Sequence, residues 1–140
     1  MFDLERLTKI ISDIYRYLDD LEKIEPKDLH DLDDIRNFYA VSMILFTLIN
    51  RAIDLGDEIV TSRNLGVPGT YREIFSLLER GGVIDKKLAS DLSNLVYQRN
   101  ILAHEYYNLT TEDVFKVCRR MPVVREFVER VKENIFDSNI

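Results

Sequence analysis

Residues 38–49 read FYAVSMILFTLI, and only Ser42 and Thr47 interrupt the apolar side chains. A helix of this composition is apolar on nearly every side and needs neighbours all round. We therefore predict a helix over about residues 31–63 that forms the central, most buried element of the fold. Gly56 lies within it and weakens the helix by about 1 kcal/mol relative to alanine. A close helix crossing is favoured as the reason for this glycine, over a functional role for Gly56 and Asp57.

Amphipathic patterns on both sides predict the helices that surround this one. The first helix has apolar residues in alternating steps of three and four, which form the seam of a bundle. These residues are Leu4, Leu7, Ile11, Ile14, Leu18 and Leu21. Pro26 ends this helix. After a loop with glycine and proline at residues 64–69, Thr70 caps a short helix that Gly81 and Gly82 close.

Two further helices complete the predicted fold. Asp85 is placed to cap a helix over residues 85–107, and the turn at residues 108–113 begins a last helix that continues to about Phe136. Pro122 is expected to kink or split that helix near Met121. Four long helices joined by short loops predict an all-α fold, an antiparallel four-helix bundle with one short additional helix. With three prolines and five glycines in 140 residues, there is little room for linkers, and residues 1–140 are expected to form one domain.

Charge restricts the possible partners. The formal net charge is -6 and the pI is near 5.0, so the surface as a whole does not attract nucleic acid. Any contact with nucleic acid must therefore be local. Arg119, Arg120 and Arg125 on the last helix form either a local positive wall or an exposed charged face.

Composition also indicates the compartment. Residues 1–6 are charged, so no signal peptide is expected, and the longest apolar run is far shorter than the roughly 20 residues of a membrane span. The single cysteine, Cys118, has apolar neighbours and is expected to be a buried thiol in a reducing environment. We expect a cytoplasmic protein without a membrane segment.

The segment YQRNILAHEYY, residues 97–107, is where polarity and helical period disagree. At about 100° per residue, Arg99 falls on one stripe with leucines 88, 92, 95 and 102. A guanidinium keeps its charge, so this position requires a carboxylate, a phosphate, backbone carbonyls or an opening onto a cleft. His104 lies about 140° further round the helix. Arg99 and His104 can share a site only if the helix distorts or ends near Ala103, or if a second copy of the chain contributes its own pair.

A structural role is the other interpretation of these two residues. Arg99 can form a buried ion pair, with Asp57 as the candidate partner, and a histidine at a helix end can satisfy the terminal carbonyls.

The remaining side chains restrict the chemistry. The sequence has no Glu-x-x-His pair, cysteine cluster or paired histidines, so neither a metal nor a cofactor is expected. His30 lies in an acidic loop and is interpreted as a solvated side chain. RNA carries its own nucleophile, the 2′-hydroxyl, so an imidazole that moves the proton and a guanidinium that binds the phosphorane oxygens are sufficient for cleavage. Arg99 and His104 are the candidates for these catalytic roles, with Asn100 as a residue that orients His104 or the phosphate, but the two residues by themselves favour the structural interpretation.

Two properties follow from this assignment. Each chain has few catalytic groups, so we predict a homodimer whose two Arg99 and His104 pairs face one cleft across a twofold axis. Cleavage by the 2′-hydroxyl is predicted to need no metal and to leave a 2′,3′-cyclic phosphate.

The motif Arg99-x-x-x-x-His104-x-Tyr106 resembles that of the HEPN superfamily of helical ribonucleases and nucleotide-associated domains, and within it the HepT-like toxins. The segments IDLGDEIV at residues 53–60, YREIF at residues 71–75 and GVID at residues 82–85 are typical of the same subfamily. The similarity therefore covers most of the chain. It implies an endoribonuclease toxin of a type VII-like toxin-antitoxin pair, and this context favours catalytic roles for Arg99 and His104 over the structural interpretation.

The resemblance also implies a cognate minimal nucleotidyltransferase antitoxin that adds AMP to the motif tyrosine, which is Tyr106 in this chain. On an ideal helix Tyr106 returns to the apolar stripe, and Tyr107, about 100° round, is the more exposed phenol. Modification of Tyr106 therefore requires the helix to end or loosen by about His104. Some members of the superfamily are non-catalytic partners of nucleotidyltransferases, and such a binding module is the alternative function.

Overall fold

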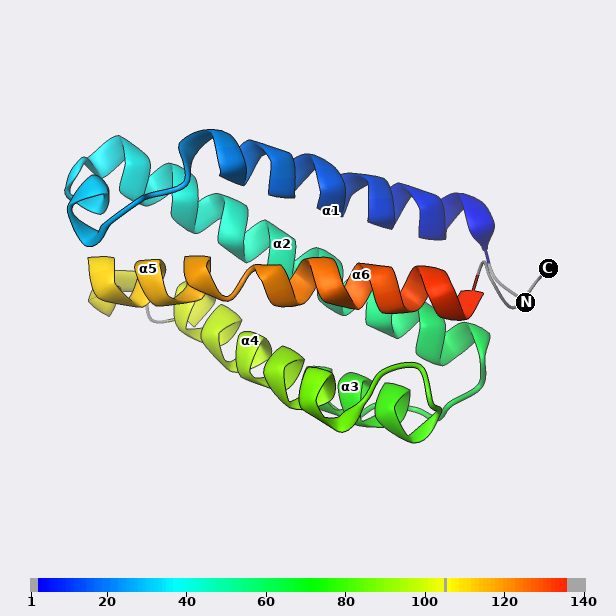
Figure 1. Ribbon diagram of the computed structural model, residues 1–140. Coiled ribbons are helices and arrows are strands. Elements are labelled where there is room, and N and C mark those ends of the chain that lie inside the picture. The colour runs from blue at the N-terminus through cyan, green and yellow to red at the C-terminus, as the bar shows by residue number, and fades with distance from the viewer. Residues whose placement is uncertain (1–2, 105, 136–140) are drawn as a thin grey trace.

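The computed structural model describes residues 3–104 and 106–135, and within these residues it contains helices and no strand (Figure 1). The elements are α1 (Leu4–Ile24), η1 (Leu29–Asp33), α2 (Ile35–Ser62), α3 (Tyr71–Arg80), α4 (Lys86–His104), η2 (Tyr106–Asn108), α5 (Thr111–Arg119) and α6 (Pro122–Ile135). In Figure 1, α1, α2, α4 and the consecutive pair α5 and α6 run from side to side in alternating directions, as the four antiparallel members of a bundle. The short α3 lies beside α4. The predicted four-helix bundle with one additional helix is confirmed.

The centre of the bundle is α2, as its composition predicts. It packs against α1, α3, α4, α5 and α6. Among the described helices, only α2 is long and apolar enough to meet the length and composition criterion for a membrane span, although its apolar side chains are broken by polar ones. The contacts of α2 with five other helices explain its apolar composition, because these contacts bury apolar side chains inside the bundle.

Capping side chains set the helix boundaries. The Asp85 carboxylate accepts the backbone N–H of Leu88 at 2.8 Å at the start of α4, and Thr70 and Thr110 cap α3 and α5. Pro122 splits the last predicted helix into α5 and α6. These predictions are confirmed.

The start of α2 differs from the sequence prediction. Residues 29–33 form the separate 3₁₀ turn η1, and α2 begins at Ile35 instead of near Asp31. The reason is a pair of caps. Asp28 and Asp31 form a capping box around η1, and the Asp34 carboxylate then accepts the N–H of Arg36 at 2.9 Å, which starts a new helix.

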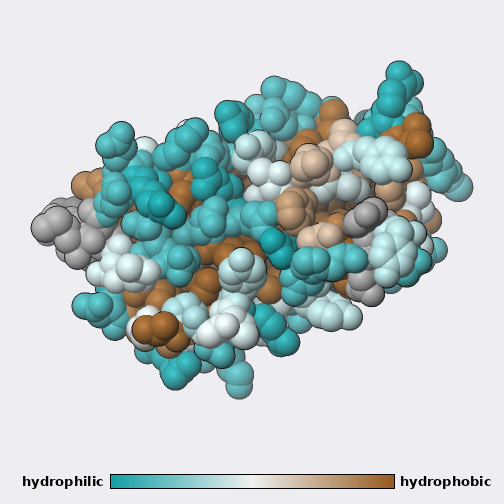
Figure 2. All heavy atoms as spheres, turned by 180° about the vertical axis from the view of Figure 1, so that it is seen from behind, coloured by the Kyte–Doolittle hydropathy of each residue, from teal (hydrophilic) through white to brown (hydrophobic). Residues whose placement is uncertain are grey.

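One side of α2 is not covered by the residues that the structure describes. Ile35, Tyr39 and Met43 lie four residues apart, on one face of the helix, and each side chain is 64% exposed. The prediction that residues 38–49 are enclosed on all sides is therefore wrong for this face. We call these three residues the α2 stripe. Figure 2, which views the molecule from behind, shows apolar surface between polar margins on that side of the protein.

Cys118 is buried in α5, as predicted. Burial, with a smaller contribution from the negative charge of Glu25, raises the pKa of its thiol to about 11. The thiol is therefore neutral in the folded protein near pH 7, which is the state expected of a structural cysteine.

Gly56 is the point where α2 and α3 make their closest approach. A Cβ atom at this position would lie 2.7 Å from Cγ2 of Ile74 and 3.4 Å from Leu78 and Phe75. The close helix crossing favoured by the sequence is therefore present.

The crossing gives a first prediction. Gly56→Ala removes a helix-weakening glycine, yet we expect it to lower the free energy of unfolding by about 1–3 kcal/mol, because the new methyl group overpacks the crossing. Urea denaturation measures this change. Ile74→Ala should also lower the free energy of unfolding. The loss in the double variant should be smaller than the sum of the two single losses. A stabilising Gly56→Ala would contradict the crossing.

Candidate active site

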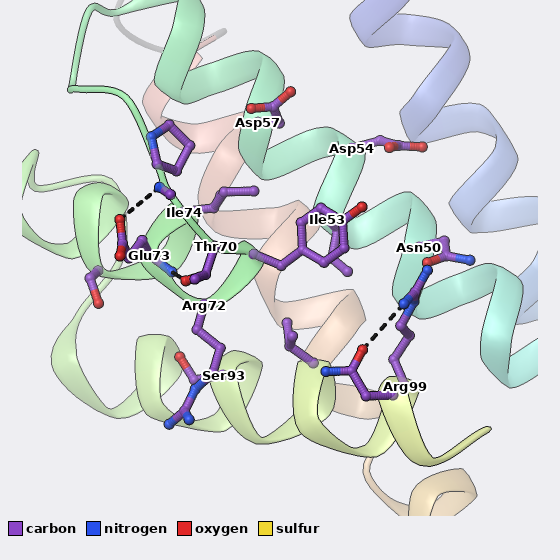
Figure 3. A pocket seen from close by; sticks show the side chains of 16 residues that line it. Asn50, Ile53, Asp54, Asp57, Thr70, Arg72, Glu73, Ile74, Ser93 and Arg99 are labelled. Atoms are coloured by element: carbon purple, nitrogen blue, oxygen red, sulfur yellow. Dashed lines mark hydrogen bonds between the residues drawn. The ribbon is translucent and has the colours of Figure 1, made fainter. Parts of the chain in front are cut away.

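An open cleft of about 1260 Å³ lies between α2, α4 and α3 with the loop before it (Figure 3). The polar residues from α2 are Asn50, Asp54 and Asp57, and α4 contributes Arg99 and Asn100. The third wall is formed by residues 68–74 together with Ser76. Two of the three segments that resemble the HepT-like subfamily, residues 53–60 and 71–75, thus contribute to this cleft.

Arg99 is held in this cleft by two amide groups and two aromatic rings. Its Nε donates to Oδ1 of Asn50 at 2.9 Å, and its Nη1 donates to Oδ1 of Asn100 at 3.2 Å. The guanidinium carbon lies 5.2 Å from the ring centre of Phe46 and 5.6 Å from that of Tyr71. Figure 3 shows Arg99 reaching from α4 to Asn50 on α2. The hydrogen bonds of Nε and Nη1 and the two aromatic rings fix the Arg99 side chain before any ligand binds.

The charge of Arg99 is not neutralised by a carboxylate of the described residues. Asp57 lines the same cleft, but no ion pair with Arg99 forms, so the structural interpretation with Asp57 as its partner is wrong. Asp54 is bound to Nη1 of Arg51 at 3.0 Å instead. Arg99 is half-buried and so keeps a positive charge aimed at an open, partly apolar cleft. Such a group is suited to binding an anion.

Arg51 shows what a structural arginine looks like in this bundle. It donates to the buried Asp13 of α1 at 2.7 Å as well as to Asp54. The hydrogen bond from Lys9, and then that from Arg51, hold the pKa of the Asp13 carboxyl below its usual value. This network joins α1 to α2 and leaves Arg51 committed to carboxylates.

His104 and Asn100 lie four residues apart on α4, and no hydrogen bond joins them in the described part of the chain. Asn100 accepts from Arg99 and lines the cleft. His104 is exposed as the last residue of α4 and is not among the residues that line the cleft. Helix α4 thus ends at His104, in agreement with the sequence-based alternative of an end near Ala103, but this end alone does not bring the imidazole into the cleft with Arg99.

The two tyrosines follow the end of the helix. Tyr106 begins the 3₁₀ turn η2, and its side chain lies outside the described residues. Tyr107 is 73% exposed, as expected. The loosening of the helix near His104 that modification of Tyr106 requires is therefore present in the backbone.

The predicted positive wall does not line this cleft. Arg125 forms an ion pair with Glu22 of α1 at 3.5 Å, and the Arg119 guanidinium lies 5.6 Å from the Phe115 ring. Arg120 lines a second, smaller pocket between α4 and α5. His30 is exposed beside Asp33, as predicted. The described residues contain no group of three or more His, Cys, Asp or Glu side chains arranged to hold a metal ion.

Sequence reasoning missed several residues that position Arg99. Asn50 and Phe46 lie on the helix predicted to be central, and nothing in their local sequence marks them as partners of an arginine on another helix. Tyr71 was singled out only within a family-like segment. The sequence offered one signal for these partners. An arginine in an apolar stripe needs polar partners from other helices, and the segments at residues 53–60 and 71–75 were candidates to supply them.

Comparison with known sequences gives consistent matches. A sequence model of the family described as ribonuclease HepT-like matches residues 14–131. The mRNA nuclease HepT of Shewanella oneidensis is 30% identical over 81 residues, which cover 57% of this chain and 61% of that protein. The tRNA nuclease HepT of Aphanizomenon flos-aquae is 31% identical over 103 residues, which cover 73% of this chain and 70% of that protein. The first of these alignments spans less than two thirds of the relative.

Solved structures share the fold at lower identity. A tri-AMPylated HEPN toxin of Shewanella oneidensis in complex with MNT antitoxin has a TM-score of 0.83 and 24% identity, over 94% of this chain and 98% of that one. The cytosolic protein YutE of Bacillus subtilis, of unknown function, has a TM-score of 0.85 and 18% identity, over 99% and 95% of the two chains.

The contrast between the two arginines gives a second prediction. Arg99→Met should change the free energy of unfolding by less than about 1 kcal/mol, because methionine keeps the packing against Phe46 and Tyr71 and leaves no buried charge unpaired. Arg51→Met should cost about 3 kcal/mol, because it strips a partner from buried Asp13. Urea denaturation of both variants measures the difference. A loss at Arg99→Met equal to that at Arg51→Met would identify Arg99 as structural.

Proposed function

Because the chain belongs to the ribonuclease HepT-like family, we propose that it is a metal-independent endoribonuclease toxin of a type VII-like toxin-antitoxin pair, made of one domain and acting in the cytoplasm. The observation that carries the proposal is Arg99, which is fixed by Asn50, Asn100 and two rings in an open cleft and has no carboxylate partner among the described residues. The names of the relatives, an mRNA nuclease and a tRNA nuclease, support RNA as the substrate class.

The proposed reaction needs only groups that the motif supplies. The imidazole of His104 removes the proton of the 2′-hydroxyl, whose oxygen attacks the adjacent phosphorus. The guanidinium of Arg99 binds the phosphorane oxygens as negative charge develops on them. The protonated His104 imidazole of a second copy of the chain gives its proton to the 5′-oxygen as the P–O5′ bond breaks, which yields a 2′,3′-cyclic phosphate and a 5′-hydroxyl. Asn100 holds Arg99 in the orientation that this role requires.

The site is incomplete in one chain, which supports a homodimer. His104 is exposed outside the cleft that holds Arg99, and the reaction needs both a base and an acid. The exposed α2 stripe offers the surface for the contact, because it continues along α2 to Phe46, beside the Arg99 guanidinium. Pairing of two such stripes across a twofold axis buries apolar side chains and brings four motif residues into one cleft.

Control by a nucleotidyltransferase antitoxin is the next part of the proposal. It is supported by the AMPylated toxin of similar fold that is bound to an antitoxin. We propose that the antitoxin of this chain transfers AMP to Tyr106, two residues after His104. AMP at this position would bring a phosphate close to the site, where it would compete with RNA for the Arg99 guanidinium.

One observation favours the alternative, a non-catalytic module that binds a nucleotidyltransferase. A single chain presents Arg99 without His104 in the cleft, so a protein that stays monomeric has a cation for binding and lacks the imidazole that the proposed cleavage needs. The state of assembly and the cleavage assay distinguish the two functions.

The reaction gives a third prediction. Purified protein should cleave RNA in EDTA and leave 2′,3′-cyclic phosphate ends. Arg99→Ala and His104→Ala should each lower the rate by at least about a hundredfold with the fold intact by circular dichroism. Arg80→Ala, which removes an exposed arginine at the end of α3, should leave the rate unchanged. Cleavage that disappears in EDTA, or that survives both motif substitutions, is inconsistent with the mechanism.

The dimer gives a fourth prediction. Light scattering should show a dimer that Met43→Glu converts to a monomer, because two carboxylates would face each other in the buried contact. Val67→Glu is the matched control, since Val67 is exposed in the loop after α2. When wild-type and His104→Ala chains are exchanged in equal amounts, activity should fall to about a quarter, because both histidines of a pair are needed. A fall to about one half would indicate independent sites.

The modification gives a fifth prediction. Co-expression with the neighbouring nucleotidyltransferase should add AMP to the chain and abolish cleavage, and peptide mass spectrometry should place the adduct on Tyr106. Tyr106→Phe should escape modification, whereas Tyr107→Phe should be modified as the wild type is. Adducts confined to Tyr107, or none with an active partner enzyme, would show the assignment to be wrong.

A further inference from the structure

The second pocket of the molecule lies on the other side of α4 from the Arg99 cleft. It has a volume of about 260 Å³ and is formed by α4, α5 and the segment between them. Its walls combine the ring of Tyr97, the amide of Gln98, the side chain of Leu109 and the cations Lys116 and Arg120. Arg99 follows Gln98 directly in the sequence, so the two pockets flank the same turn of the helix.

The amide of Gln98 is the feature that needs an explanation. Its Oε1 atom is completely buried and finds no hydrogen-bond partner among the described residues. A buried polar atom without a partner is unfavourable and uncommon in native proteins. Because Gln98 is half-buried and lines the pocket, a rotation of its side chain brings Oε1 to a ligand there, which then provides the missing hydrogen bond. The amide carries both a donor and an acceptor, which match the edge of a nucleobase.

The other walls suit the same ligand. Tyr97 is 63% exposed, so one of its faces is free for stacking, which is how proteins hold unpaired bases. Lys116 and Arg120 are exposed and form no ion pair with a described residue, so they can bind a phosphate beside the base. The one carboxylate of the pocket, Asp113, is engaged by the N–H of Thr110 at 3.1 Å. The volume is slightly below that of pockets for drug-sized molecules, about 300 Å³ at the small end, and suits one base.

We propose that this pocket holds one nucleobase of the bound RNA strand, separated from the cleaved phosphate by the width of α4, with Tyr97 stacking on the base, Gln98 bonding its edge, and Lys116 and Arg120 binding the phosphate beside that base. The inference rests on the proposed ribonuclease function and assigns its substrate a second contact region. It also places the sequence preference of the enzyme in the pocket between α4 and α5, since Arg99 binds a phosphate that all nucleotides share.

The test uses binding, so that it does not depend on cleavage. Pentanucleotides with 2′-O-methyl riboses cannot be cut by the 2′-hydroxyl and carry 4-thiouridine at one position for photo-crosslinking to the full-length protein. We expect one position of the thio-base to crosslink to the peptide that contains Tyr97. Gln98→Leu should weaken binding about tenfold, and Lys116→Ala should lower the slope of log affinity against log salt by about one. Lys86→Ala, at the opposite end of α4, is the control and should change neither.

Gln98 is half-buried, so its substitution can also affect folding. Tyr97→Ala is the second variant for this reason, because Tyr97 is exposed and its loss should remove the crosslink without unfolding the protein. Unchanged binding by Gln98→Leu and Tyr97→Ala, or crosslinks spread evenly over all positions, would overturn the pocket even if Arg99→Ala abolishes cleavage. Conversely, a Tyr97 crosslink in a protein that cleaves no RNA would refute the nuclease and leave the nucleobase pocket standing.

Discussion

Burial of α2 is the interaction on which the rest of the structure depends. Five other helices pack against it, and at Gly56 the approach of α3 is so close that no side chain fits between them. The first half of the helix has a face that the chain leaves open. The candidate site lies at the boundary between these two halves, where Phe46 and Asn50 of α2 meet Arg99 of α4. The site thus lies where the part of α2 that the other helices enclose meets the part with an exposed face.

Two arginines in the same bundle show opposite solutions to the same physical problem. Arg51 and Arg99 both lie partly within the protein, where an unpaired charge is costly. Arg51 forms ion pairs with Asp13 and Asp54, which neutralise its charge and join α1 to α2. Arg99 is held by neutral oxygens and by ring faces, which orient a guanidinium without cancelling its charge. A group prepared in this way has attraction left for a phosphate and needs little rearrangement to use it.

Much of the fold could be predicted from the sequence because it depends on local signals. Caps at Thr70 and Asp85, the break at Pro122 and the crossing at Gly56 are each visible in a few neighbouring residues. The start of α2 was misplaced because consecutive aspartates offered two possible caps. The site was harder, since Asn50 and Tyr71 become partners of Arg99 only through tertiary packing, and an exposed His104 gives no sign of where a second chain would lie. Periodicity describes one helix at a time and carries little information about contacts between helices.

The hydrogen bond between Tyr15 of α1 and Glu129 of α6 joins residues 114 positions apart, at a length of 2.8 Å. Chains fold from the N-terminus as they leave the ribosome, so α1 can pair with α2 early but must wait for this partner until α6 has been synthesised. The cleft around Arg99, by contrast, uses only residues 46–100. During translation the bundle therefore stays open along the side that α6 will occupy, while the parts of its cleft are already present.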